Sequence, residues 1–167
     1  MAIIVRGKVW KFGNDINTDL MDPGFARSGG WEATRKYILH IHPKFNAEVK
    51  PGDIIIGGRN YGCGSSRETA ASNLKKLGIG AVIGESFGRI FFRNCIAVAL
   101  PILQCPKVGE KFTEGDSAEL DLENSVVRNL TTGQEVQGIP LSPMMIEIMS
   151  KGGILQAMRE TLGKIKA

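Results

Sequence analysis

Three short apolar runs in the middle of the chain have the length and the β-branched content of buried strands. They are Ile54–Ile56, Ile79–Gly84 and Leu100–Leu103. Helix-like sequence separates them at Ser65–Gly78 and Glu85–Cys95. Two strand–helix–strand units in succession favour parallel strands joined by right-handed crossovers. The middle of the chain therefore predicts an α/β core.

The two ends of the chain have a different texture. Arg6–Phe12 mixes apolar and basic residues and predicts a first strand. In the last third, short apolar segments separated by polar turns predict antiparallel hairpins. These segments are Lys111-Phe112, Ser117–Leu122, Ser125–Leu130 and Gln134–Val136. Ser142 before Pro143 is typical of a helix start, and Gly152-Gly153 separates that helix from a short terminal helix.

Between the first strand and the core, the chain has few strand signals. Asp15–Asp19 is polar and predicts a loop. Met21–Gly30 contains Pro23 and three glycines, so we expect an exposed loop there. Trp31–His40 has apolar residues near helical spacing and predicts a helix that Pro43 ends.

The most informative stretch joins the first buried run to the helix that follows it. Gly57–Gly64 carries four glycines in eight residues, which permits positive φ angles and a close approach of the backbone to a ligand. Ser65 and Glu68 have the S-x-x-E spacing of a capping box. We therefore expect the helix to begin at Ser65 and to end at Gly78.

A helix start of this kind is a candidate anion site. Free backbone N–H groups and the positive end of the helix dipole would meet there, next to Ser66 and Arg67. The planar fork of Arg67 matches a carboxylate or a phosphate. The alternative is an ordinary strand–turn–helix in which Ser65 only caps the helix. No Gly-Lys-Ser/Thr follows the glycines, which excludes a Walker-type phosphate loop.

Composition narrows the class of protein. With 167 residues, 43% of them hydrophobic, we expect one domain over residues 1–167 that needs neither disulfides nor metal. The net charge of +4 comes from scattered Lys and Arg, which argues against nucleic acid as a partner. No run approaches the ~20 apolar residues of a membrane helix, and the start lacks a signal-peptide pattern. We therefore expect a cytoplasmic protein without a membrane partner.

Cysteine and histidine give no predicted metal site. Cys63, Cys95 and Cys105 match no zinc or iron–sulfur spacing and are expected to be free thiols. His40 and His42 have no cysteine or acidic partner at ligand spacing. Cys63 precedes the serines, but no histidine lies near it in sequence to act as its base. We interpret it as a small residue in a crowded loop.

The segment Gly62-Cys63-Gly64-Ser65-Ser66-Arg67-Glu68, placed after a strand, resembles the signature of the aconitase family. Within that family it is most similar to the small-subunit or swivel domain of isopropylmalate dehydratases and homoaconitases. Other segments resemble landmarks of the family in the same order. They are Lys8–Gly13, Asp15–Asp19, Pro51–Asp53, Glu85–Ile90 and Gly152–Leu155. The resemblance covers essentially the whole chain and implies a swivelling β/β/α fold.

The resemblance also implies roles for individual residues. Ser65 matches the base that removes the proton beside a carboxylate, and Ser66 and Arg67 match the groups that bind the substrate carboxylate. Asp19 matches the acid of a threonine–aspartate pair that reaches the active site, although by itself it would more often be a turn or cap residue. The family's [4Fe–4S] cluster has no ligand set in this chain. A large subunit is expected to carry the cluster and to complete the site at the interface.

The expected substrate is a small di- or tricarboxylic hydroxy acid. Many members of the family carry a Tyr-Leu-Arg-type segment where this chain has Met21–Gly30. Phe25 and Met21 suit an apolar pocket for an isopropyl group, and Arg27 suits a substrate carboxylate. The alternative is a mobile surface loop with Arg27 in solvent. A single loop arginine favours isopropylmalate over homocitrate and leaves methylmalate and dimethylmalate open. A non-catalytic anion-binding regulatory module is the alternative of a different class.

Overall fold

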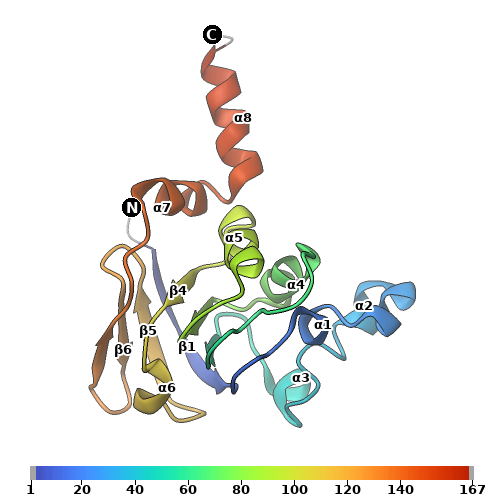
Figure 1. The fold of residues 1–167 in the computed structure, drawn as a ribbon, viewed down its shortest axis with the longest axis vertical. Helices are drawn as coiled ribbons and strands as arrows, with labels where there is room; N and C mark the ends of the chain where they lie inside the picture. The colour runs from blue at the N-terminus through green and yellow to red at the C-terminus, as the bar shows by residue number, and fades with distance from the viewer. Residues whose placement is uncertain (1–2, 166–167) are drawn as a thin grey trace.

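Seven strands form one mixed sheet in the computed structural model, which describes residues 3–165 (Figure 1). Their order across the sheet is β4-β3-β2-β1-β5-β6-β7. The strands are β1 (Ile4–Lys11), β2 (Ile54–Gly57), β3 (Ala81–Gly84), β4 (Ile102–Gln104), β5 (Ser117–Asp121), β6 (Val126–Asn129) and β7 (Glu135–Gln137). Strands β1 to β4 pair in parallel, and β5 to β7 add to β1 as antiparallel neighbours. Strand β1 therefore joins a parallel half to an antiparallel half.

Helices connect and cover the parallel half. They are α1 (Thr18–Met21), the 3-10 helix η1 (Gly24–Gly29), α2 (Gly30–Thr34), α3 (Phe45–Glu48), α4 (Thr69–Leu77), α5 (Arg89–Ala97), α6 (Val108–Lys111), α7 (Pro143–Ser150) and α8 (Ile154–Ile165). Figure 1 shows α4 and α5 beside each other next to the parallel strands, with α1, α2 and α3 on one flank. Within residues 3–165, no helix is both long and apolar enough to cross a membrane.

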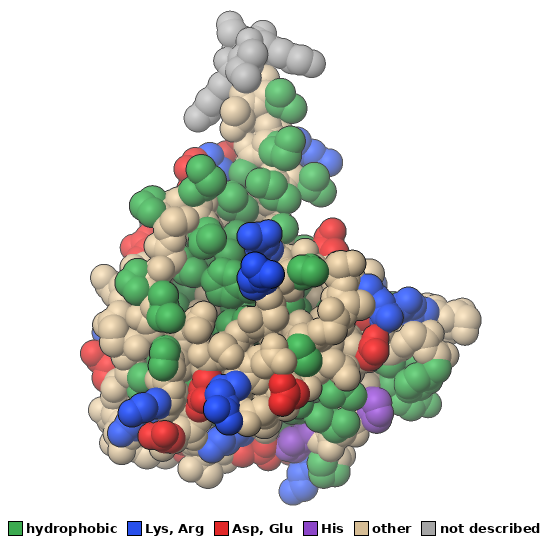
Figure 2. Space-filling view, in the orientation of Figure 1, with side chains coloured by type: hydrophobic (Ala, Val, Ile, Leu, Met, Phe, Trp, Pro, Cys, Tyr) green, Lys and Arg blue, Asp and Glu red, His purple; other side chains and the backbone are tan. Residues whose placement is uncertain are grey.

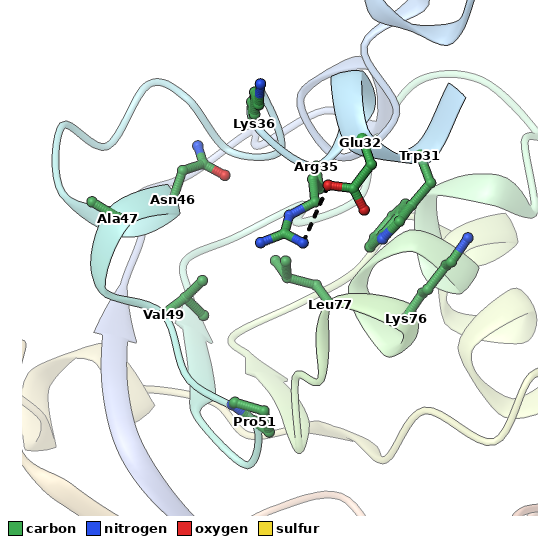
Figure 3. A pocket seen from close by; sticks show the side chains of 10 residues that line it. All are labelled: Trp31, Glu32, Arg35, Lys36, Asn46, Ala47, Val49, Pro51, Lys76 and Leu77. Atoms are coloured by element: carbon green, nitrogen blue, oxygen red, sulfur yellow. Dashed lines mark ion pairs between the residues drawn. The ribbon is translucent and has the colours of Figure 1, made fainter. Parts of the chain in front are cut away.

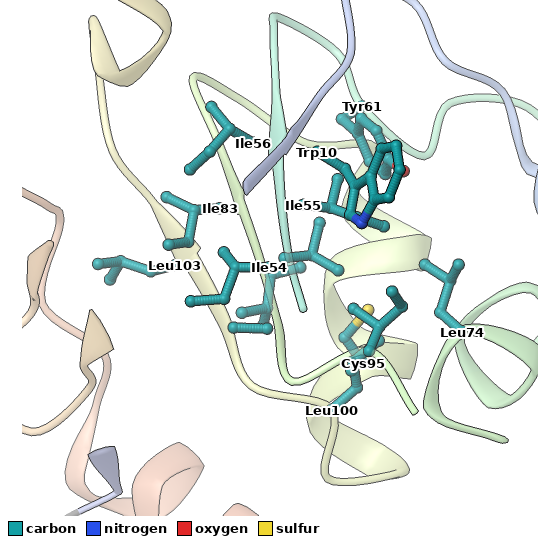
Figure 4. Close-up of a cluster of buried hydrophobic side chains, with 14 of the residues drawn as sticks. Trp10, Ile54, Ile55, Ile56, Tyr61, Leu74, Ile83, Cys95, Leu100 and Leu103 are labelled. Atoms are coloured by element: carbon teal, nitrogen blue, oxygen red, sulfur yellow. The ribbon is translucent and has the colours of Figure 1, made fainter. Parts of the chain in front are cut away.

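The hydrophobic core includes the parallel strands and the inner sides of α4 and α5 (Figure 4). Ile54–Ile56 of β2 are fully buried, and Leu74 of α4 and Cys95 of α5 are buried in the same cluster. The indole N–H of buried Trp10 donates to the Asp53 carboxylate at 2.8 Å, so this polar group is not left unsatisfied. The packed core thus fixes the end of β2, where the glycine-rich loop begins.

The structure confirms the predicted architecture. The three central runs form the parallel strands β2, β3 and β4, with α4 and α5 as crossovers. The last third forms antiparallel β5, β6 and β7 as expected. The strand expected at Lys111-Phe112 is wrong, because Lys111 ends helix α6 and Phe112 is its C-cap residue. The Ser142 side chain accepts from the Met145 N–H at 3.3 Å and caps α7 with Pro143 in its first turn. Helix α8 follows after Gly152 and Gly153, both at positive φ.

The predicted start of α4 is wrong. The helix begins at Thr69, and Glu68 stands at its N-cap without a side-chain cap hydrogen bond. The capping box between Ser65 and Glu68 therefore does not form, and Ser65 lies outside the first helical turn. The predicted end is correct, because Gly78 adopts φ 97° and its N–H bonds to carbonyls of the last turn.

The prediction of an exposed loop at Met21–Gly30 is also wrong. The segment forms the end of α1, the 3-10 helix η1 and the start of α2, and it buries Met21, Asp22 and Ala26. The helix expected over Trp31–His40 ends at Thr34 and continues as turns. The tertiary contacts of the buried side chains order this glycine-rich stretch, which local propensity alone does not reveal.

Candidate functional site

The candidate site lies where three loops leave the carboxyl ends of parallel strands. One loop runs from β1 to α1, the glycine-rich loop follows β2, and a third connects β3 to α5. Backbone hydrogen bonds tie the loops together. The Gly62 N–H donates to the Ile16 carbonyl at 2.7 Å, and the Gly88 N–H donates to the Tyr61 carbonyl at 2.9 Å. This edge is where ligands bind in open α/β sheets.

Two glycines of the central loop are required by close packing. Gly62 has φ 75°, and a Cβ at this position would lie 2.2 Å from the Phe91 ring. Gly64 has φ 107°, a backbone conformation that side chains disfavour, and lies beside Thr18. The two glycines let the chain pass between α5 and α1 and bring Ser65 alongside α1.

Ser65 is bonded to Thr18 rather than to a helix terminus. The hydroxyl oxygens of the two residues lie 3.1 Å apart, and the Ser65 N–H also donates to Thr18 Oγ1 at 3.1 Å. Thr18 is in turn held by its own N–H, which donates to the Cys63 carbonyl at 2.8 Å. Thr18 is buried and Ser65 is half-buried. The buried threonine thus fixes the backbone and the side chain of the candidate base.

Arg67 and Asp19 form an ion pair in a cleft. Arg67 Nη1 lies 2.8 Å from Asp19 Oδ1. Both residues line a cleft of about 420 Å³ together with Asn17, Phe25 and His40, among others. The structure thus brings two predicted site residues and Phe25 into one cavity. Met21, which we expected beside Phe25, is instead fully buried and does not line the cleft.

The two serines lie at the edge of this arrangement. Ser65 and Ser66 do not line the cleft and precede Arg67 directly in the chain. Ser66 is exposed. The serines and Arg67 are therefore close in sequence, but within the described residues they do not form one enclosed pocket.

The buried carboxylate of Asp22 organises the neighbourhood of the cleft. Its oxygens receive the Arg27 guanidinium at 2.7 Å, the Thr69 hydroxyl at 2.6 Å and the Asn73 amide at 3.3 Å. The Asp22 carbonyl also accepts from Arg67 at 3.4 Å. Asp22 therefore connects η1 to the first two turns of α4 and to the candidate anion binder.

The pKa of Asp22 reflects this environment. Burial by itself raises the pKa of the carboxyl group, but hydrogen bonds from Thr69 and Arg27, with the charges of Arg27 and Arg67, bring the pKa below its ordinary value. Asp22 is therefore ionised at neutral pH. Sequence analysis missed this residue, although an acid between Met21 and Pro23 in an otherwise apolar stretch was an available signal.

The Arg27 guanidinium is held by the Asp22 carboxylate and does not line the cleft. It makes two contacts with that carboxylate, through Nε at 3.1 Å and Nη2 at 2.7 Å. It is absent from the residues that line the cleft. Arg27 was predicted to bind a substrate carboxylate, with a solvent-facing arginine as the alternative; in the structure it forms an ion pair with Asp22 that orders η1.

The thiols and imidazoles do not form a metal centre in the described part of the chain. No group of three His, Cys, Asp or Glu residues there could hold a metal ion. Cys95 and Cys105 are buried in the core, and burial, followed by the charge of Asp15, raises the pKa of the Cys63 thiol. His42 Nε2 lies 2.8 Å from Glu114 Oε2. These residues do not fit an iron–sulfur cluster.

A larger cavity of about 510 Å³ lies elsewhere (Figure 3). Trp31, Arg35 and Lys76 are among its lining residues, and Figure 3 shows the Arg35 guanidinium near its centre. Lys76 belongs to the last turn of α4, whereas Thr69 begins the helix near the candidate site. The two ends are roughly 10 Å apart at 1.5 Å per residue. This cavity is therefore separate from the candidate site.

Comparison with known proteins identifies the family. The aconitase C-terminal domain matches residues 35–107. The small subunit of the isopropylmalate/citramalate isomerase of Methanocaldococcus jannaschii is 43% identical over 166 residues, which cover 98% of this chain and 99% of that protein. This chain belongs to the small subunits of the aconitase family. The family predicted from the glycine–serine–arginine signature is thus confirmed.

Other members of the family show the same full-length likeness. The crystal structure of a 3-isopropylmalate dehydratase from Methanocaldococcus jannaschii has a TM-score of 0.86 and 33% identity, covering 98% of this chain and 99% of that chain. The methanogen homoaconitase small subunit of Methanothermobacter thermautotrophicus is 38% identical and covers 97% of this chain and 95% of that protein. Six further relatives named 3-isopropylmalate dehydratase small subunit are 38% to 42% identical. The predicted swivel-type fold is confirmed by this structural match.

Thr18 should matter for stability through its hydroxyl group. Replacing Thr18 with valine keeps the shape but leaves the Ser65 N–H without its acceptor, so the free energy of unfolding should fall by about 1–2 kcal/mol. Thr18→Ser, which keeps the hydroxyl, should retain most of the stability. Denaturant unfolding of both variants measures the difference. Equal stability of the valine variant and the wild type would contradict the assigned hydrogen bonds.

Proposed function

We propose that this chain is the small subunit of a hydro-lyase that interconverts 2-isopropylmalate and 3-isopropylmalate by dehydration and rehydration. The names of its relatives support this activity, since most of those at 38% to 43% identity are isopropylmalate enzymes. The observation that carries the proposal is the placement of Ser65. It is fixed by Thr18 at the carboxyl edge of the parallel strands, two residues before an arginine that lines a cleft.

Ser65 acts in this proposal as the base that takes a proton from the carbon beside a substrate carboxylate. Serine needs its alkoxide form to do so, and hydrogen-bond donors and nearby positive charge stabilise an alkoxide. Thr18 Oγ1 already accepts from the Ser65 N–H, so its own O–H is available to donate to Ser65 Oγ. Thr18 and the Arg67 charge therefore replace the helix terminus that the sequence suggested. In the rehydration step, Ser65 returns the proton to carbon.

Arg67 and Ser66 bind the substrate carboxylate in this proposal. The Arg67 guanidinium is paired with exposed Asp19, and a pair of this kind exchanges readily with a ligand carboxylate because solvent screens it. Asp19 then positions Arg67 in the free protein and is available as an acid or base when the substrate displaces it. Asp19 and Arg67 line the same cleft, which is consistent with both roles of Asp19.

The reaction also requires loss of hydroxide from the substrate. The family resemblance implies a [4Fe–4S] cluster on a large subunit as the Lewis acid, and the described cysteines of this chain do not fit such a cluster. The proposed partner is therefore that large subunit, which completes the site. The residues of this chain supply proton transfer and carboxylate binding.

The loop geometry favours an apolar substituent on the substrate. Arg27 is held by Asp22, so it is less available to a third carboxylate, and Phe25 is exposed at the cleft. This observation supports isopropylmalate over homocitrate, although one relative is a homoaconitase subunit. Alkylmalates that differ by a methylene are distinguished by only ~1–3 kcal/mol, so methylmalate and dimethylmalate enzymes are the nearest alternative.

The test is turnover by the complex with the large subunit from the same organism, reconstituted anaerobically with iron and sulfide. We expect no hydro-lyase activity from this chain alone and the highest kcat/KM of the complex with isopropylmalate, compared with homocitrate, citraconate and dimethylmalate. Arg27→Ala should leave the substrate order unchanged, because Arg27 contacts Asp22. If the complex turns over homocitrate better than isopropylmalate and Arg27→Ala removes that preference, isopropylmalate is the wrong substrate. A complex that binds these acids without turnover would support the non-catalytic anion-binding module instead.

A further inference from the structure

Helix α8 extends beyond the body of the protein and leaves an apolar side uncovered (Figure 1). Leu155, Met158 and Leu162, which lie three and four residues apart, are 70%, 53% and 54% exposed. In the described part of the chain, α8 packs mainly on α7 and α5. A helix of 12 residues is marginal in water without tertiary packing. An amphipathic helix of this length therefore needs another surface against its apolar side.

The direction of α8 is set by a tight junction. Gly153 has φ 116°, and a Cβ there would lie 2.5 Å from the Ala97 carbonyl oxygen at the end of α5. Only glycine permits this approach without strain. A groove of about 310 Å³ then forms between α7 and α8, with Ile148, Met158 and Leu162 among its lining residues. The apolar side of α8 therefore has a defined position and forms one groove with residues of α7.

Helix α5 connects this surface to the candidate site. Its first residues follow Gly88, where a Cβ would lie 2.6 Å from the Gly62 carbonyl oxygen of the glycine-rich loop. A smaller pocket of about 170 Å³ beside α5 is lined by apolar Phe92 and Met145 and by basic Arg89 and Arg93, among others. In Figure 2, apolar side chains gather in this region, and basic side chains stand among them.

These residues define one continuous surface, which we call the α5–α8 face. It consists of Phe92, Met145, Ile148, Met158 and Leu162, with Arg89 and Arg93 beside Phe92 and Met145; α7 joins the two parts, because Met145 lines the pocket at α5 and Ile148 lines the groove at α8. It begins beside the loop that carries Ser65 and ends on the exposed side of α8.

The basic residues on the α5–α8 face distinguish between two kinds of partner, a second copy of this chain and a different chain. A two-fold contact between two copies of this chain would bring the same patch of each copy together. Arg89 and Arg93 would then face their own copies, and like charges across an interface are unfavourable. A different chain that presents apolar side chains and carboxylates avoids this repulsion. The face also adjoins a site that, under the proposed function, another subunit must complete.

We propose that the α5–α8 face is the docking surface for the large subunit, which would present an apolar groove for α8 and acidic side chains for Arg89 and Arg93. This inference rests on the proposed function. It gives α8 a role in assembly of the complex. Helix α8 lies at the end of α5 that is farther from the candidate site. Binding would bury the apolar side of α8 and fix the large subunit along α5, over the Ser65 loop.

The experiment measures the Kd between the full-length chain and the large subunit from the same organism. Leu162→Glu and Met158→Glu should each weaken binding at least tenfold. Gln156→Glu, which adds the same charge to the other side of α8, should stay within twofold of the wild type. Arg93→Glu should weaken binding and reduce its dependence on salt, because rim and interface charges act partly through long-range attraction. The chosen side chains are exposed or half-exposed, so circular dichroism of each free chain should be unchanged.

The outcomes separate the two proposals. Wild-type affinity in Leu162→Glu and Met158→Glu would overturn the docking surface. A wild-type chain that forms dimers on its own, which Met158→Glu dissociates without affecting large-subunit binding, would assign the face to a second copy and overturn the proposal as well. A complex that depends on α8 but has no hydro-lyase activity would support the docking surface and count against the proposed function alone.

Discussion

Replacing Ser65 with alanine is expected to lower kcat of the assembled enzyme by about 10²–10⁴, because proton transfer by a positioned side chain contributes that much. The substitution removes the Oγ that would take the proton and leaves the Ser65 N–H bond to Thr18 in place. The loss of one side-chain hydrogen bond should cost only about 1 kcal/mol of stability. KM should change little if Arg67 and Ser66 still bind the carboxylate.

The control for this prediction is a second serine close by. Ser72→Ala on α4 removes a weak side-chain bond to Glu68 at 3.5 Å and should leave kcat unchanged. Steady-state kinetics of both variants, with thermal unfolding of each free chain, separates chemistry from folding. A folded and assembled Ser65→Ala enzyme that keeps more than a tenth of the wild-type kcat would show that Ser65 is not the base.

The sheet was predictable because its strands are recognisable one by one. The runs at β2, β3 and β4 are apolar on both faces, as parallel strands covered by helices must be. The hairpins β5 to β7 are separated by turn residues. Short elements were not predictable in the same way. Helices α1, α3 and α6 have four residues each, too few for a helical period to appear in the sequence.

The sequence provided candidate site residues but not the geometry of the site. The family resemblance suggested Ser65, Arg67 and Asp19, and the structure pairs the last two in one cleft. The expected capping box failed because Thr18, distant in sequence, satisfies the Ser65 N–H and hydroxyl in place of the helix end. A long-range hydrogen bond of this kind has no local sequence signal. The roles of these residues in catalysis stay predictions.

The most destabilising change near the site should be Asp22→Asn. The asparagine keeps the size of the side chain but presents an NH₂ group where a carboxylate oxygen accepts from Thr69 or Arg27. Removing one partner of a buried ion pair costs several kcal/mol, and the partial exposure of Arg27 reduces that cost. We therefore expect the free energy of unfolding to fall by about 2–4 kcal/mol. KM for the substrate should rise, because loosening the segment around residue 22 also loosens the backbone carbonyl that accepts from Arg67.

The pH dependence of this loss provides the decisive measurement. The folded pKa of Asp22 is lowered, so its contribution to stability is fully present above the unfolded pKa, near 3.9, and is lost as the pH falls through the folded pKa. The difference in unfolding free energy between wild type and Asp22→Asn should therefore be largest at neutral pH and shrink below about pH 4. Glu32→Gln, which breaks an exposed pair with Arg35, should cost less than about 1 kcal/mol at neutral pH. If the difference between wild type and Asp22→Asn stays constant from pH 7 to pH 3, the ionised carboxylate does not hold η1 to α4, and packing around residue 22 alone stabilises the segment.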